Sequence, residues 1–354
     1  MANLQATGLA DLVATTLNEL GENKFTDMMS DYQDTVALKR LMKKNKTTFK
    51  AGTEIQFNAM VDHNHSARYV PLGAPDIVDI NNVMITGKIP WRHMTWNFAI
   101  ERREIAMNRA PRQIVDLVKT RRLAALGSAI IKFEEQFWKT PSVDDDLLPY
   151  GIPTYIVKSN TAASAANADG FNGSVPSGWT NVANINPTTY PRWKNYATQY
   201  TAVTKDDLIR KWRRASVKTN FKPLIDGMPT YNTGDDYLFA TNYSVMGPLE
   251  ESLEAQNDNL GNDIASKDGM VMFKRAPVLY VKELELDTTN PVYGINFGEL
   301  SCVGLLGEWM HETQIAVDSE RHTMSTTHTD CTYNMQCRNR RRQFVLATDT
   351  TLPA

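Results

Sequence analysis

The longest regular pattern in the chain, from Arg112 to Lys139, predicts a helix. Pro111 suits the first turn of a helix, where its missing N–H needs no partner, and the next proline is Pro141. At 1.5 Å per residue this helix would be a rod of about 40 Å. Its apolar positions form two stripes on rotated faces, namely Ile114, Leu117, Val118 and Ala125, and then Leu126, Ile130, Phe133 and Phe137. The rotation favours a rod with different partners at its two ends, although an ordinary long core helix also fits.

Two stretches alternate between apolar and polar residues and predict the two limbs of one projecting hairpin. In residues 54–61 and 94–100 the apolar side chains recur at every second position, as in a strand with one covered face. Residues 83–85 also fit the returning limb. A long stretch rich in Pro, Gly, Asp and Asn separates the two limbs, and such loops are uncommon inside compact domains. Because a two-stranded hairpin is marginally stable by itself, we expect its apolar face to pack on an adjacent molecule, through Phe57, Ala59, Trp96 and Phe98.

The remaining elements are mixed in type. Patterning predicts helices over 205–219, where Thr204 and Asp207 fit a capping box, and around 249–253. It predicts strands at residues 152–157, 237–241, 270–273, 278–286, 292–297 and 343–347. Since helices and strands do not alternate regularly, as they would in a doubly wound fold, the expected fold class is α+β.

Composition narrows the class of protein. The 354 residues are 42% hydrophobic and 22% charged, so a packed core is expected. The net charge of −2 argues against a strongly basic nucleic-acid-binding protein, and any such contact would have to be local. Two basic runs are candidates for such a local contact with nucleic acid. Residues 39–50 are more typical of a solvated arm, whereas residues 338–342 would meet either carboxylates of a neighbouring subunit or phosphates.

The cysteines and the apolar runs bear on the cellular compartment. Cys302, Cys331 and Cys337 are odd in number and form no disulfide framework, which favours a reducing compartment. The N-terminus lacks the pattern of a signal peptide. No apolar run approaches the roughly 18 residues of a membrane span. We expect a soluble protein made in a cytoplasm.

Candidate chemistry is weak. His63 and His65, flanked by Asp62 and Asp79, have a spacing that could share a metal, but no third ligand lies near them in the sequence. Three further residues, His328, Cys331 and Cys337, lack paired CxxC spacing, and Asp144, Asp145 and Asp146 do not match a calcium loop. No catalytic motif is present. We therefore expect no enzymatic activity, no metal and no cofactor, while a metal-dependent hydrolase using His63 and His65 stays as an alternative. A soluble nucleic-acid-binding protein acting through the two basic runs is another.

The order of these parts resembles the major capsid protein of tailed double-stranded DNA bacteriophages, which has the Hong Kong ninety-seven type capsid fold. The block GMVMFKRAPVLYVKELELDTTNPVYGINF resembles the axial-domain strands of that family, and CRNRRRQFVL resembles the strand that returns to its peripheral domain. The resemblance implies an N-terminal arm at 1–52, an extended loop at 53–103, a peripheral domain at 104–151 and 301–354 with the spine helix 112–139, and an axial domain at 152–300. The chain departs from the family in lacking a long charged scaffolding region and in its irregular insert at 158–203.

Family members assemble as pentamers and hexamers into icosahedral shells around packaged double-stranded DNA. The resemblance therefore implies a structural protein of the virion capsid, synthesised in the host cytoplasm. Its implied partners are other copies of itself, a scaffolding protein, a portal, in some members a decoration protein, and DNA contacted weakly and without base specificity. The residues that we expect at contacts between subunits are Phe57, Ala59, His63, His65, Arg68, Trp96, Phe98, Arg121, Arg122, Glu134, Glu135, Arg338, Arg340 and Arg341.

Overall fold

The structure is a computed structural model that describes residues 32–43, 47–62, 67–73, 82–107, 111–158, 169–221, 236–257, 271–274, 276–317 and 321–348. Its helices are α2 (Val36–Leu41), α3 (Arg102–Met107), α4 (Pro111–Phe137), α5 (Ile152–Tyr155), α6 (Arg210–Lys218) and α7 (Tyr243–Asn257). Its strands are β1 (Thr48–Lys50), β2 (Glu54–Met60), β3 (Met84–Pro90), β4 (Arg92–Glu101), β5 (Tyr196–Gln199), β6 (Tyr237–Thr241), β7 (Met272–Phe273), β8 (Ala276–Tyr280), β9 (Val292–Asn296), β10 (Leu300–Leu305), β11 (His311–Glu312), β12 (Ala316–Val317), β13 (Met324–Cys337) and β14 (Phe344–Ala347). The expected α+β class is confirmed.

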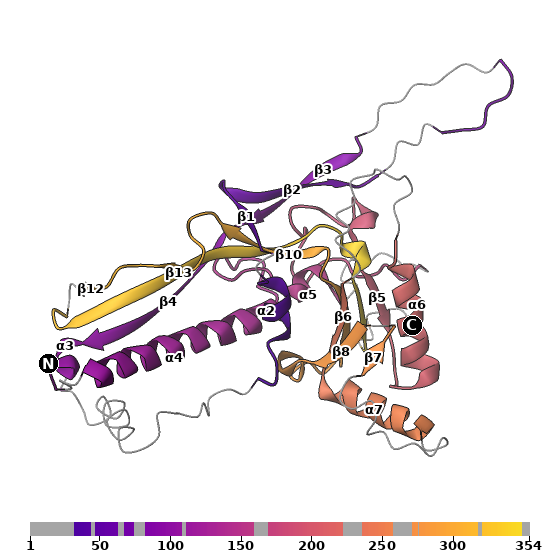
Figure 1. Cartoon of the computed structure of the whole chain (residues 1–354). Coiled ribbons are helices and arrows are strands. Elements are labelled where there is room, and N and C mark those ends of the chain that lie inside the picture. The colour runs from indigo at the N-terminus through magenta and orange to yellow at the C-terminus, as the bar shows by residue number, and fades with distance from the viewer. Residues whose placement is uncertain are drawn as a thin grey trace.

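The long helix α4 lies along a six-stranded sheet and forms the elongated half of the molecule (Figure 1). The centre of that sheet is β13, which pairs antiparallel with β10 over one part of its length and with β4 over another. Phe133 of α4 lies 5.1 Å from the ring of Tyr333 on β13 and 6.1 Å from that of Trp96 on β4. The predicted spine helix is confirmed, and its C-terminal half is fixed on the sheet by aromatic packing.

A second six-stranded sheet forms the other half, in the order β5-β14-β9-β6-β8-β7. Helices α6 and α7 lie on this side of the molecule (Figure 1). Trp212 of α6 packs edge-on against Phe239 of β6 at 4.9 Å and stacks on Phe273 of β7 at 4.4 Å. The predicted helix at 205–219 is confirmed as two continuous pieces, a π-helical turn at Lys205–Ile209 and then α6. At its start Thr204 accepts a hydrogen bond from the Asp207 N–H, as the capping prediction requires.

The strand expected at residues 152–157 is wrong. Residues 152–155 form the short helix α5, because Pro153 suits a first helical turn. The strand that the resemblance assigns to the peripheral domain is β14, which pairs with β5 and β9 in the second sheet. The range 53–103 expected for the extended loop includes β4, which belongs to the sheet over α4.

The central strand β13 was not expected from the sequence at all. Its sequence, MSTTHTDCTYNMQC, carries mostly hydroxyl, amide and charged side chains in place of apolar ones. Its second half is nevertheless buried from Cys331 to Cys337. Thr and Tyr favour strands through their shape, and that composition was the one available signal.

Replacement of Phe133 by Ala tests the contact between α4 and its sheet. Phe133 is 1% exposed, so we expect Phe133→Ala to reduce the free energy of unfolding by about 3–5 kcal/mol, as large-to-small core substitutions do. Leu126, on the same helix but 43% exposed, supplies the control, and Leu126→Ala should cost less than about 1 kcal/mol. Urea denaturation followed by circular dichroism measures both. Equal losses for the two variants would show that α4 is not anchored through Phe133.

Candidate intersubunit interface

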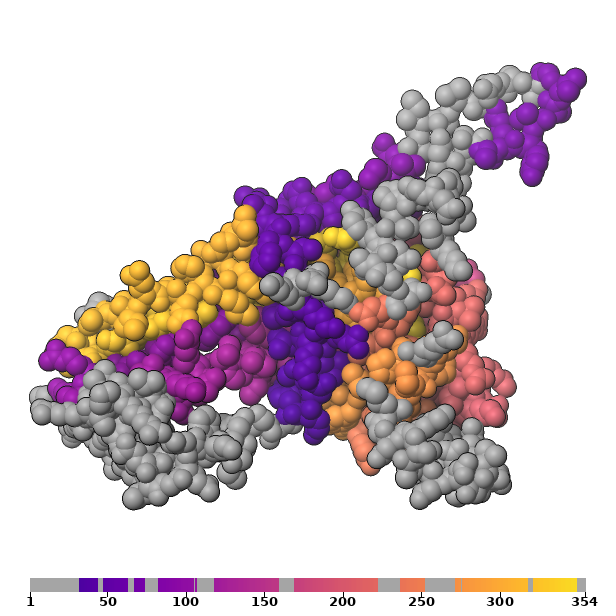
Figure 2. Space-filling view, in the orientation of Figure 1, coloured from indigo at the N-terminus to yellow at the C-terminus, as the bar shows by residue number. Residues whose placement is uncertain are grey.

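A projecting hairpin is confirmed, but its limbs are β2 and β3. They pair antiparallel in a register that runs from Glu54 opposite Pro90 to Met60 opposite Met84. Phe57 crosses over Gly87, where a Cβ atom would lie 2.4 Å from the Phe57 ring, so only glycine fits. The hairpin extends from its base on the two-sheet body out beyond the rest of the described chain (Figures 1 and 2).

The base of this hairpin packs on its own subunit, which bears on four contact candidates. Phe57 is 9% exposed and its ring lies 6.0 Å from that of Trp193, and Ala59 packs against the same core. Trp96 lies over Phe133 of the chain's own α4. Phe98, half-buried, faces Thr327 of β13 in the strand register. The chain's own helix and sheets thus bury Phe57 and partly cover Ala59, Trp96 and Phe98, which keep some surface and stay candidates for contact with a neighbour.

The far end of the hairpin has the opposite character. Residues 67–73 are exposed throughout, with Tyr69 and Leu72 at 106% and 108% of their reference areas and Val70 at 57%. Arg68 is exposed beside them, whereas His63 and His65 lie outside the described residues. The sequence reasoning passed over Tyr69 and Leu72, although YVPL is an apolar run inside a polar loop and was the signal for them. This segment, residues 67–73, is called the hairpin tip below.

The charged candidates on α4 have partners within the chain. Arg121 donates two parallel hydrogen bonds to Glu104 of α3, at 2.7 and 2.9 Å, and so ties α3 to α4. Arg122 donates to Glu312 while its side chain stays 62% exposed. Glu135 accepts from Lys132 at 2.8 Å. Of these residues, Arg122 keeps the most surface for a neighbour.

Glu134, another candidate on α4, is an internal cap. It is 1% exposed, and its carboxylate accepts hydrogen bonds from the backbone N–H groups of Ala37 and Leu38 at 3.0 and 2.9 Å. The indole of Trp138 donates a third bond at 2.8 Å. Burial raises the pKa of Glu134, and these three bonds to its charged form oppose that effect. Its expected role at a subunit contact is wrong, because it holds α2 against α4 and has no surface to offer.

The arginine run 338–342 divides between the core and the surface. Arg340 is fully buried and donates to the carbonyl groups of Tyr155, Ser174 and Trp193 and to the side-chain oxygen of Asn195, at 2.7–3.2 Å. Burial lowers its pKa to about 10, so it is still charged at neutral pH. A subunit contact through Arg340 is therefore excluded by its burial.

Its two neighbours in the candidate set reach the surface. Arg341 is partly exposed and lies over the rings of Phe171 and Phe221, at 4.4 and 4.8 Å. Arg338 lines a polar cavity of about 360 Å³ with Lys50 and Gln336. Both stay candidates for contact with another molecule.

Over the described ranges, no group of three or more His, Cys, Asp and Glu side chains could hold a metal ion. Among the helices in those ranges, none has both the length and the apolarity to cross a bilayer.

Comparison with known proteins identifies the fold. No known family model and no curated protein sequence matches the chain. The cyanophage A-1(L) capsid subunit is similar at a TM-score of 0.65 and 16% identity, over 95% of this chain and 99% of that one. The capsid subunit of a native GTA particle follows at 0.54 and 14%, over 97% and 98%. The SrpI encapsulin of Synechococcus elongatus PCC 7942 follows at 0.51 and 9%, over 95% of both chains. The chain therefore has the tailed-phage capsid fold, which the encapsulin shares.

Substitution of Arg340 tests the junction that it holds. Arg340→Met removes the donor of the Tyr155, Ser174 and Trp193 carbonyl oxygens and one of the two donors to the Asn195 amide oxygen, and we expect a loss of about 3 kcal/mol or more in the free energy of unfolding. Arg340→Lys keeps the charge but not the planar fork, so an intermediate loss is expected. Arg103, whose side chain is 63% exposed, supplies the control, since Arg103→Met should cost less than about 1 kcal/mol. Thermal and urea melts measure all three. Arg340→Met as stable as Arg103→Met would contradict the assignment.

Proposed function

We propose that this chain is the major capsid protein of a tailed bacteriophage, a structural subunit that assembles as pentamers and hexamers into an icosahedral shell around packaged double-stranded DNA. The observation that carries the proposal is the hairpin tip. It exposes Tyr69 and Leu72 completely at the end of a two-stranded stalk far from the subunit's own core (Figure 2).

The physical case rests on the cost of leaving apolar surface in water. Burial of a large apolar side chain is worth about 1.5–3 kcal/mol, and exposed patches of this kind mark sites of interaction. The base of the stalk already packs on Trp193 of its own subunit, so the tip is held away from the body that could cover it. In our proposal the tip docks on the next copy. Repeated around a closed symmetric shell, such contacts between identical surfaces supply the stability of the whole.

The similar structures support this reading because the match spans whole subunits. The chain covers 99% of the cyanophage capsid subunit and is itself covered over 95% of its length. We propose that the chain is made in the host cytoplasm and enters the virion with a scaffolding protein and a portal, and that its contact with packaged DNA is weak and without base specificity. A decoration protein on the outer surface is compatible with this assembly.

A non-enzymatic role agrees with the chain's perturbed ionisable groups. Burial raises the pKa of the Cys331 thiol to about 11 and that of the Cys302 thiol further still. Both lie in the core beside Tyr333, where a thiol packs as a small apolar group. These shifts follow from packing in a core and do not need a catalytic explanation.

A second candidate function follows from the similarity to an encapsulin. The encapsulin subunit matches over 95% of both chains, and its fold alone does not distinguish a genome shell from a compartment with other contents. The contents of the assembled particle separate the two functions.

The first prediction is that the purified chain, expressed with its scaffold, forms closed particles far heavier than its own 39.9 kDa. Electron microscopy and light scattering measure this. Particles from the native source should hold nuclease-protected double-stranded DNA. A monomer at every concentration with scaffold present would refute the shell. Particles that hold protein and no DNA would assign the encapsulin-type function instead.

A second prediction concerns the hairpin tip. The double substitution Tyr69→Ser with Leu72→Ser removes apolar surface that touches nothing in the subunit, so the melting temperature should not change while closed particles become rare. A matched control is Leu147→Ser with Leu286→Ser, at side chains 80% and 90% exposed outside the hairpin. It should assemble as the unmodified protein does. Normal shells from the tip variant, or a lowered melting temperature, would show that the tip is not the intersubunit contact.

A further inference from the structure

Helix α6 presents a basic face to solvent. At about 100° per residue, Arg210, Arg213, Arg214 and Lys218 fall within an arc of about 140°, and all four are exposed. The opposite side of the helix is buried through Trp212 and Ala215. Neighbours on such a face are about 5–6 Å apart at their Cβ atoms. The helix therefore holds four cations in a row on one surface of a protein whose net charge is −2.

The nearby carboxylates offset this charge only in part. Asp206 lies 3.3 Å from Arg210, but both side chains are more than three-quarters exposed, so the pair is weak. Asp207 turns away from the face and accepts from Lys211 at 2.9 Å and from the backbone N–H groups of Thr201 and Ala202. Partial burial opposes ionisation of Asp207, yet these bonds outweigh it and lower its pKa. The negative charge of Asp207 is therefore already compensated by Lys211 and the two N–H groups, and it does little to neutralise the arginines of this face.

Two further arginines extend the face beyond the end of the helix. Arg341 lies over Phe171 and Phe221, and Phe221 follows α6 in the chain. After burial, the proximity of Arg192 is the next cause that lowers the pKa of Arg341, which places two like charges close together. Asp169 acts on Arg341 and also pairs with Lys218 at 3.5 Å. The α6 surface is accordingly defined as Arg192, Arg210, Arg213, Arg214, Lys218 and Arg341.

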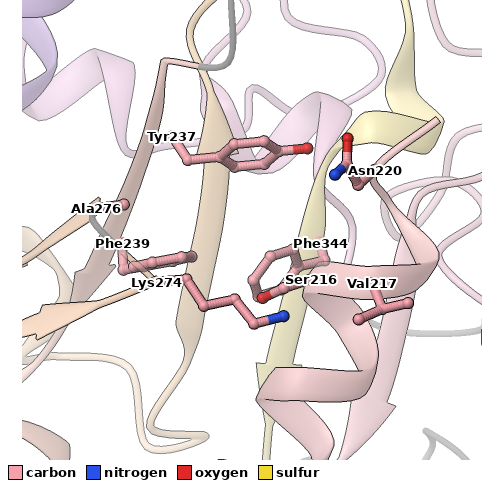
Figure 3. Close-up of a pocket in the computed structure, with 8 residues that line it drawn as sticks. All are labelled: Ser216, Val217, Asn220, Tyr237, Phe239, Lys274, Ala276 and Phe344. Carbon is pink, nitrogen blue, oxygen red and sulfur yellow. The ribbon is translucent and has the colours of Figure 1, made fainter. Parts of the chain in front are cut away.

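A pocket of about 600 Å³ lies along one edge of this surface, between α6 and the second sheet. Ser216, Val217 and Asn220 of α6 and its following turn face Lys274, whose amine reaches across from the turn between β7 and β8 (Figure 3). Lys274 donates a long hydrogen bond of 3.5 Å to the Arg213 carbonyl. The Ser216 hydroxyl donates to the Trp212 carbonyl, so the groups that the pocket adds beside the arginines are the Lys274 ammonium and the Asn220 amide, both of which bind phosphate oxygens.

We propose that the α6 surface, with Lys274 at its edge, binds the phosphate backbone of double-stranded nucleic acid without reading its bases. The assignment names the residues of the weak genome contact and so rests on the proposed function. Arginine predominates over lysine on the surface, and its planar fork suits phosphate. The two exposed apolar side chains within it, Val217 and Phe221, are 68% and 39% exposed, too little apolar area for a protein partner held mainly by hydrophobic burial.

The test is the salt dependence of binding to a labelled 30-base-pair duplex of arbitrary sequence. With about five phosphate contacts, the slope of log K against log salt should be about −4.5, which is a roughly 500-fold loss of affinity between 50 and 200 mM salt. The triple substitution of Arg210, Arg213 and Arg214 by Gln should make the slope shallower by about 2.7. It should also weaken binding at 100 mM salt at least tenfold, with no change in the melting temperature, because all three side chains are exposed.

The matched control removes three exposed lysines on α4 and just after it, by substituting Gln for Lys119, Lys132 and Lys139. It should bind the duplex as the unmodified chain does. Equal weakening by both triple variants would reduce the effect to net charge and overturn the site, as would tighter binding of poly-glutamate of equal charge, which would assign the surface to an acidic protein. Particle formation is measured in parallel. The α6 variant should still assemble, so failure of this inference leaves the shell proposal separately tested.

Discussion

The buried guanidinium of Arg340 is the interaction on which the arrangement of the two halves depends. It lies in the connection that leaves β13 of the first sheet and enters β14 of the second. From there it donates to backbone carbonyls of α5 and of two separate points in the segment 174–193. A buried charge is costly unless its donors are matched. These partners come from three parts of the chain. Displacing any one of them would leave a buried donor of Arg340 unpaired, so this one side chain holds all three in place.

A second buried charge, near the C-terminal end of α4, performs a similar task. The Glu134 carboxylate on α4 accepts the first N–H groups of α2, which a helix of six residues has no other means to satisfy. The segment before β1 is thereby attached to the long helix, and β1 then pairs with β10 in parallel. The buried ion pair of Arg342 with Glu299, 3.1 Å apart, adds a third fixed point beside Arg340. Polar groups at defined positions, together with the apolar core, thus decide how helix, sheets and arm segment meet.

The packing of this body explains why the base and the tip of the hairpin differ in exposure. Its base is held by Phe57 over Gly87 and against Trp193, so the stalk leaves the body in one direction. Its tip carries Tyr69 and Leu72, which are fully exposed. In our proposal this exposed apolar tip makes the contact with the next copy of the chain. The basic face of α6 lies on the other half of the molecule (Figure 1), and we propose a different kind of partner for it.

The sequence by itself determined the elements whose patterns are local. The proline-bounded helix α4, the capped helix that includes α6, the strands β2, β6 and β9, and the α+β class all follow from periodicity and capping, because those signals depend on neighbours a few residues away. The existence of a projecting hairpin also followed, from the long polar stretch between its limbs.

Only the tertiary structure decided which strands pair and which charges are buried. The sequence placed residues 83–85 and 94–100 in one limb opposite β2, although only the first overlaps β3 and the second is β4, because alternation marks a half-buried strand without naming its partner. It missed β13, whose polar side chains are buried because distant segments pack on them; Asn334, for example, accepts from the Tyr150 N–H and donates to the Pro90 carbonyl. It placed Glu134 and Arg340 at the surface, since charged residues are seldom buried unless partners match them, and those partners lie 97 and up to 185 residues away. Contacts across such separations leave no local pattern to read.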